Sequence, residues 1–189
     1  MTTELATLIA AAIAATASVA ELFFNRFSEN RASFRALLQP IIAQLGEAMY
    51  SIVASANVMV ETTTTVQFSN WYGKAIKERE KLKALRSKAR YPLWGLDEGI
   101  RVLIRVPDWA SHARSDKKRA DKLLKRADAL RHVMDVVALR CYRNGRLPDL
   151  LEVWQVKYRA WQCRSVFINH ESHSNQTQTE NPDLGGNVA

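Results

Sequence analysis

The chain has 189 residues, with 27 Lys and Arg against 19 Asp and Glu, a net charge of +8, and only 7 glycines and 5 prolines. This scarcity of helix breakers, beside abundant Ala, Leu, Lys, Arg and Glu, predicts an all-α protein. Two cysteines are too few for a disulfide framework, and no second ligand pair stands at zinc-site spacing. Cys141 and Cys163 are therefore expected to be buried apolar residues in a reducing compartment.

The stretch from Leu5 to Phe24 is a candidate membrane anchor, because twenty helical residues reach about 30 Å, the thickness of a bilayer hydrocarbon core. Eight of the twenty are alanine, which neither drives nor strongly resists insertion. Eight larger side chains are expected to supply roughly −2.5 to −5 kcal/mol, less the cost of the polar residues among them. These anchor residues are Leu5, Leu8, Ile9, Ile13, Val19, Leu22, Phe23 and Phe24.

Three other interpretations of this stretch stay open. A cleaved signal peptide fits the small residues 17–20, but residues 1–4 carry no basic side chain. The stretch could instead be an alanine-rich helix buried in a soluble bundle or oligomer, or a helix lying along a membrane surface.

If the stretch spans a membrane, the flanking charges predict its orientation. Arg26, Arg31 and Arg35 follow it and no Lys or Arg precedes it, so the positive side stays inside. We expect a single-pass inner-membrane protein with its N-terminus out and the bulk of the chain cytoplasmic. Within the span, a small-residue row at every fourth position is a hypothesis for self-association; the row is Ala6, Ala10, Ala14 and Ser18.

A second helix is expected from Ser28, a candidate N-cap, with Pro40 kinking it or marking its first turn. Its apolar residues recur at steps of mostly three and four, the pattern of one buried helical face. They are Phe34, Leu38, Ile41, Leu45, Ala48, Ile52, Ala56 and Met59. Polar interruptions argue against a second span here, and the threonine run 62–65 is expected to end the helix.

The next helix is predicted over 71–90, and the sequence 91–95 breaks it. The segment 100–106 is ambiguous between a short helix and a strand, although Asp97 and Glu98 before it favour a helix. Pro107 is expected to end this element in either case.

The clearest pattern is a helical hairpin, expected to pack antiparallel like a coiled coil. Ser115-Asp116 caps its first helix, whose core stripe is Leu123, Ala127, Leu130, Met134, Val137 and Cys141. Asn144-Gly145 ends that helix, and Leu147-Pro148-Asp149 starts the second. The stripe expected in the core from the second helix is Leu147, Leu151, Trp154, Tyr158 and Trp161.

These elements divide the chain into an anchor helix (1–27), a basic helical-bundle domain (28–168) and a polar tail (169–189). The tail has almost no apolar residue and is expected to be disordered. His170 and His173 on it are expected to be solvated, because no third ligand accompanies them.

Two segments concentrate the positive charge: 74–90 holds eight basic against two acidic residues, and 114–131 holds eight against three. One interpretation is that they are simply solvated helix faces. The other is that they bind an anionic surface, either membrane lipid or a nucleic-acid backbone. The candidate residues are Lys74, Lys77, Arg79, Lys81, Lys83, Arg86, Lys88, Arg90, Lys117, Lys118, Arg119, Lys122, Lys125 and Arg126.

No spacing marks a nucleophile, an acid-base pair, a phosphate loop or a metal site, so no cofactor and no enzymatic activity are expected. The favoured function is a membrane-anchored interaction or effector subunit whose basic domain faces the inner leaflet, with a homo-oligomer or a protein as partner. The alternative is a soluble basic helical protein that binds nucleic acid or a protein partner and buries its N-terminal helix.

Overall fold

The computed structural model describes the backbone of residues 2–88 and 93–179, and the side chains of residues 28–88 and 93–167. Within these ranges the chain forms helices and no strand, so the prediction of an all-α fold with a long apolar N-terminal helix and a bundle is confirmed. The helices are α1 (Thr2–Glu61), α2 (Thr65–Lys88), α3 (Asp97–Ala113), α4 (Lys117–Asn144) and α5 (Leu150–Thr179), with a 3₁₀ turn, η1 (Trp94–Leu96), before α3.

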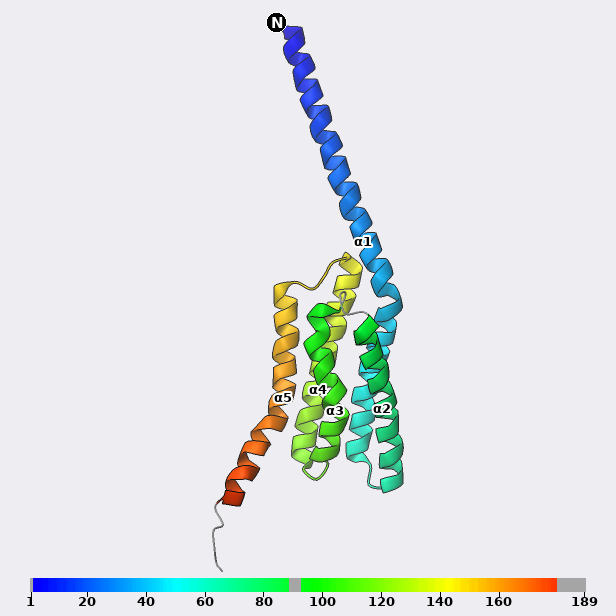
Figure 1. Ribbon diagram of the computed structural model, residues 1–189, viewed down its shortest axis with the longest axis vertical. Helices are drawn as coiled ribbons and strands as arrows, with labels where there is room; N and C mark the ends of the chain where they lie inside the picture. The colour runs from blue at the N-terminus through cyan, green and yellow to red at the C-terminus, as the bar shows by residue number, and fades with distance from the viewer. Residues whose placement is uncertain (1, 89–92, 180–189) are drawn as a thin grey trace, which may run out of the picture.

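Helix α1 is one continuous element of 60 residues, which corresponds to a length of about 90 Å. Its N-terminal half projects clear of the bundle, and its C-terminal half packs within it (Figure 1). The expected helix start at Ser28 and the expected domain boundary at 27–28 both fall inside this helix. Pro40 also lies inside it. The proline removes only one backbone hydrogen bond, and the turns on either side hold the helix together.

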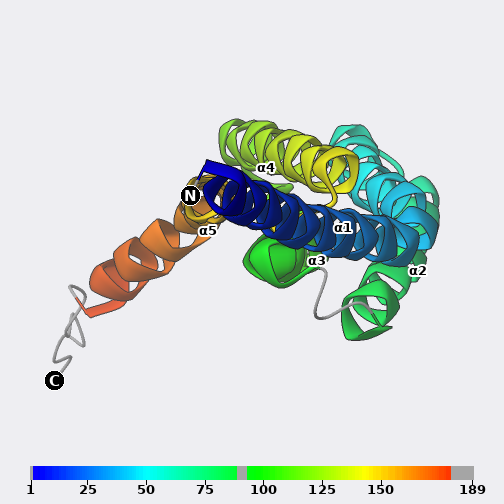
Figure 2. The ribbon, with the colours of Figure 1, turned by 90° about the horizontal axis from the view of Figure 1, so that it is seen from above.

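The packed half of α1 and the length of α4 build the core. The predicted α4 stripe from Leu123 to Cys141 is buried at every position, and so is the predicted α1 stripe except for Ile41, which is half-buried. Helix α2 returns along α1 (Figure 1), and α3 packs on α1, α4 and α5. Seen from above, the projecting half of α1 lies over the bundle, which the packed half of α1 forms together with the other four helices (Figure 2).

Several helix ends differ from expectation. The threonine run ends α1 at Glu61 as predicted, but α2 begins at Thr65, six residues before the expected start. The ambiguous segment 100–106 is helical, and the helix continues through Pro107 to Ala113. Pro107 therefore does not end the element, because the buried Trp109, Ala110 and Ala113 beyond it hold the last turns on the core.

The corner between α4 and α5 forms as predicted. Asp116 caps α4 by accepting a hydrogen bond from the Arg119 amide at 3.1 Å, and Gly145 ends it with φ of 61°. The α5 start is a reciprocal cap in which Asp149 accepts from the Glu152 amide at 2.8 Å, and Glu152 accepts from the Asp149 amide at 3.0 Å.

Helix α5 packs through a different face from the predicted one. Its buried apolar residues are Val153, Val156, Ala160 and Cys163, which also follow steps of three and four. Of the predicted stripe, Leu147 is half-buried against the core. The other four residues, Leu151, Trp154, Tyr158 and Trp161, are exposed, so the prediction is wrong for them. The small residues of the buried face permit close packing on α3, where a Cβ on Gly99 would lie 3.0 Å from Val156 Cγ1.

Helix α5 also extends to Thr179, beyond the start of the expected disordered tail at residue 169. Once packing has fixed the first turns, each further residue adds one backbone hydrogen bond, so a polar sequence can continue a helix. His170 and His173 lie outside the residues whose side chains are described, and residues 180–189 lie outside the described structure.

Candidate anion-binding surface

The basic residues of α2 are mostly paired with carboxylates. Lys81 pairs with Glu78 at 2.7 Å, Lys83 pairs with Glu80 at 2.8 Å, and Arg79 reaches Asp108 of α3 at 3.1 Å. Arg86 binds Asp97 at the start of α3. These pairs satisfy much of the charge on the predicted α2 surface locally.

Three predicted α2 residues remain outside these pairs. Lys74, Lys77 and Lys88 are exposed, and Lys74 lies over the Trp71 ring at 4.7 Å. Arg90, the last predicted residue of this segment, lies outside the described residues. The α2 surface therefore offers scattered amines rather than a concentrated site.

The first turns of α4 carry a denser charge. Lys117, Lys118, Lys122 and Lys125 are all exposed, and none of them makes an ion pair with any residue that the structure describes. Lys118 and Lys122 line a groove of about 340 Å³ between α4 and α5. The other residues lining this groove, which we call the α4–α5 groove, are Asp116, Arg119, Arg126, Ser165 and Val166.

The two arginines of the α4–α5 groove are held in place by α5. Arg126 donates to the Gln162 carbonyl at 2.6 Å and to Ser165 Oγ at 3.0 Å. Arg119 donates to the Phe167 carbonyl at 3.3 Å, and its guanidinium lies over the Phe167 ring at 4.8 Å. The groove thus combines two fixed guanidinium groups with two exposed lysines, an arrangement that suits a phosphate-bearing ligand.

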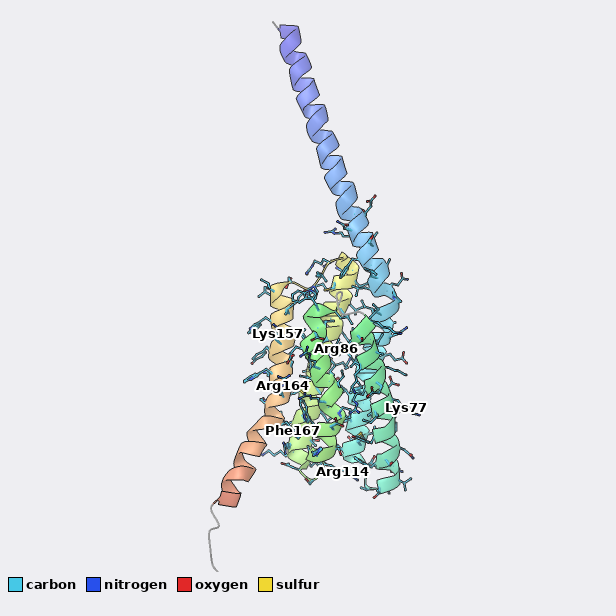
Figure 3. The ribbon with its side chains drawn as sticks, in the orientation of Figure 1. Lys77, Arg86, Arg114, Lys157, Arg164 and Phe167 are labelled. Atoms are coloured by element: carbon cyan, nitrogen blue, oxygen red, sulfur yellow. The ribbon has the colours of Figure 1, made fainter. Side chains whose placement is uncertain are left out.

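The α4–α5 groove lies at the end of the bundle away from the projecting half of α1. Helix α4 begins at that end (Figure 1), and Figure 3 labels Arg114 and Phe167 there, whereas Arg86 lies nearer the other end. The end of α2 at Arg86 and the α4–α5 groove therefore lie toward opposite ends of the bundle.

The α5 side of the groove was not anticipated from the sequence. The predicted hairpin contains a signal for it. Arg126 lies as far before the turn at Gly145 as a position next to Ser165 lies after it, so an antiparallel hairpin places the two residues side by side. Antiparallel neighbours joined by a short turn meet in this way, so the arginine and its partner could have been paired.

The described residues give less support for a metal site or a reactive cysteine. Among the described residues there is no group of three or more His, Cys, Asp or Glu that could hold a metal. Both cysteines are buried free thiols, and burial raises the pKa of Cys141 to about 11 and that of Cys163 to about 12. The expectation of a non-enzymatic protein stays a prediction.

The candidate membrane segment is described only in part. The eight predicted anchor residues lie outside the residues with described side chains. In the rest of the chain, the part of α1 from Ser28 to Glu61 is long and apolar enough to cross a membrane by length and composition. One such helix is weak evidence, and the core packing of its apolar face accounts for its composition equally well.

Comparison with known protein families, with curated proteins and with solved structures gave no match.

Proposed function

We propose that this chain is a membrane-anchored, non-enzymatic interaction protein. The observation that carries the proposal is the continuity of α1, which joins the apolar stretch 5–24 to the core of the bundle without a break. A helix of this kind, with its apolar half clear of the bundle (Figure 1), suits a tether that holds a folded domain at a membrane.

The charges after the apolar stretch support an orientation with the N-terminus out and the bundle in the cytoplasm. Arg26, Arg31 and Arg35 follow the stretch on α1, on the side that the positive-inside rule keeps cytoplasmic. In this arrangement the end of the bundle from which α1 projects faces the inner leaflet of the membrane.

The same arrangement gives the two basic segments different partners. The α4–α5 groove lies most of the length of α4 away from the leaflet, and 28 helical residues span roughly 42 Å. Electrostatic attraction to anionic lipid falls off within a Debye length of about 8 Å at physiological salt. We therefore propose that the C-terminal end of α2, at Lys88, faces the lipid of the inner leaflet. The α4–α5 groove is assigned to an anionic partner in the cytoplasm.

Alkaline carbonate extraction of membranes from cells expressing the full chain tests the anchor. Chain that stays in the membrane pellet until detergent is added supports it, and chain released by carbonate or high salt alone contradicts it. Ile9→Lys with Ile13→Lys should release the protein, because a central lysine costs about 3 kcal/mol. The matched control is Leu37→Lys on the exposed face of the packed half of α1, which should remain in the pellet.

A second candidate is a soluble protein that binds nucleic acid, and the unpaired lysines of the α4–α5 groove favour it. Filter binding of an oligonucleotide at several salt concentrations tests this candidate. Lys118→Ala with Lys122→Ala should lower the slope of log affinity against log salt by about 2. Lys81→Ala with Lys83→Ala removes two amines that already pair with glutamates and should change the slope less. Absence of retention at low salt excludes this candidate.

A further inference from the structure

Helix α5 presents large apolar side chains to solvent along one face, which we call the α5 apolar face. The exposed fractions are 83% for Leu150, 74% for Leu151, 62% for Trp154, 42% for Tyr158 and 62% for Trp161. The opposite face of the same helix is packed on the core, so the exposure is a property of the folded bundle.

The aromatic residues of this face are already ordered against one another. The Trp154 and Tyr158 rings stack with centroids 5.4 Å apart, and the Tyr158 and Trp161 rings follow at 6.1 Å. Rings that are ordered before binding lose little side-chain entropy on association, and Trp and Tyr are the residues most enriched at energetic centres of interfaces.

The size of the α5 apolar face matches what a stable dimer needs. With about 200 Å² for each large side chain, the exposed fractions correspond to roughly 600–700 Å² of apolar surface. Monomeric proteins seldom expose a contiguous patch larger than about 300–600 Å². A standard interface buries about 800 Å² on each partner, so two copies of this face could supply most of one.

We propose that the α5 apolar face is a homodimer interface, in which two copies of α5 pack in parallel and in register. Leu151 and Tyr158 occupy the a positions of a heptad, and Trp154 and Trp161 occupy the d positions. A two-fold axis along the helices brings each of these residues against its own copy.

The residues beside this seam are compatible with a parallel pair. In a parallel two-helix coil, each g position faces the next e position of the partner helix. Here Leu150 faces Gln155 and Lys157 faces Gln162 of the other copy. No like charges therefore meet across the seam, although the whole chain carries a net charge of +8.

The position of α1 agrees with the same two-fold axis. The N-terminal end of α1 lies above α5 in the side view and in the view from above (Figures 1 and 2). An axis along the outer face of α5 thus brings the two projecting helices toward each other and leaves both pointing the same way. Two tethers that point the same way can enter one membrane.

This geometry makes a lipid surface a poor occupant of the face. The first turns of helix α5 run alongside the bundle (Figure 1). The apolar face is therefore roughly parallel to the direction in which α1 leaves the bundle. A membrane entered by α1 would lie across that direction and could not cover the face along its length.

Disulfide trapping tests both the contact and its direction. Leu151→Cys and Tyr158→Cys, made separately in the full chain in detergent, should each form a cross-linked dimer with copper–phenanthroline. Cys141 and Cys163 are buried and give little background. Val66→Cys, at a position that is 73% exposed on α2, is the matched control and should stay monomeric. An antiparallel pair cannot cross-link at both positions, so trapping at only one of them overturns the parallel register.

The mass of the full chain in detergent, measured by sedimentation, gives the second readout. Trp154→Ala with Trp161→Ala should raise the dimer dissociation constant by about 100-fold or more, because each substitution removes two aromatic anchors from a symmetric interface. Helical circular dichroism should be unchanged, since both side chains are exposed. Leu37→Ala with Leu139→Ala changes two side chains that are each 56% exposed and should leave the dimer intact.

A monomeric wild-type chain, or a dimer that survives the double tryptophan substitution, overturns the proposal. So does quenching of tryptophan fluorescence by brominated lipid in a chain that does not cross-link, where the Trp154→Ala, Trp161→Ala variant loses that quenching; this result would assign the face to lipid. The proposal does not depend on the anchor: a chain released by carbonate without detergent would still cross-link through α5.

Discussion

Gly145, at the end of α4, packs directly on the backbone of Arg31 in α1. A Cβ built on Gly145 would lie 2.8 Å from the Arg31 carbonyl oxygen and 3.0 Å from its Cα. The α4–α5 corner therefore touches α1 close to the point where α1 leaves the bundle (Figure 1). This contact helps to fix the direction of the projecting helix relative to the bundle.

Gly145→Ala should destabilise the bundle, for two reasons that add. The residue has φ of 61°, where a side chain costs roughly 1–2 kcal/mol, and the Arg31 backbone cannot move aside as a flexible side chain can. We expect a loss of about 2 kcal/mol or more in the free energy of unfolding, measured by urea titration in detergent.

Gly73→Ala is the matched control for that substitution. Gly73 lies in α2, and a Cβ there would meet nothing within 4 Å. Alanine should therefore stabilise α2 by about 0.5–1 kcal/mol. Equal effects at the two glycines would contradict the packing described for Gly145.

Glu152 is a buried carboxylate with several donors around it. Its side chain is 3% exposed, accepts from the Asp149 amide, and is bound by Arg146 at 3.1 Å and by Arg140 at 3.3 Å. Glu152→Ala should cost about 1–3 kcal/mol, because it leaves a cap donor and charged donors without their acceptor. Thermal unfolding followed by circular dichroism measures the loss. Glu47→Ala, at an exposed residue of α1, should change stability by less than about 0.5 kcal/mol.

The hairpin shows how far sequence periodicity predicts this fold. In α4, the set of positions predicted to face the core runs from Leu123 to Cys141 at steps of three and four, and its burial is confirmed. In α5, two such sets compete, and the larger aromatic set is the exposed one. Periodicity gives the spacing of a buried face but cannot choose between two faces when the partner surface is unknown.

For the candidate site, the sequence predicts the basic segments and their local ion pairs but not the contacts between helices. The concentration of basic residues in α2 and α4 is visible in the sequence, and so are pairs three residues apart such as Lys81 with Glu78. Arg79 with Asp108 and Arg126 with Ser165 join different helices. Such contacts between helices decide which basic residues have no carboxylate partner, and only the packed structure shows them.

The two cysteines should resist thiol reagents in the folded protein. Burial raises the pKa of Cys163 to about 12 and that of Cys141 to about 11, so almost no thiolate is present at pH 8. With Ellman's reagent at that pH, we expect no rapid reaction until denaturant is added, and then two thiols per chain. Rapid reaction of either thiol without denaturant would show that the α4–α5 core opens more readily than its packing implies.

Asp97 should stabilise the protein in a pH-dependent way. The hydrogen bond from Arg86 lowers the pKa of Asp97 below its ordinary value of 3.8. Because the folded state favours the ionised carboxyl, the stabilisation is present above the unfolded-state pKa and is lost as the pH falls through the folded-state pKa. Wild type should therefore exceed Asp97→Asn in stability by a constant amount above about pH 5, and the difference should shrink below about pH 4.

Asp135 provides a control of opposite sign in the same measurement. Burial raises its pKa above 3.8 despite the ion pair with Arg131 at 2.7 Å. Its folded state favours the protonated carboxyl, so the stability of wild type relative to Asp135→Asn should fall as the pH rises through the raised pKa. Urea midpoints for the three proteins between pH 3 and pH 7 give both differences. Parallel pH profiles for wild type and Asp97→Asn would show that the Arg86 contact does not favour the ionised carboxyl of Asp97 in solution.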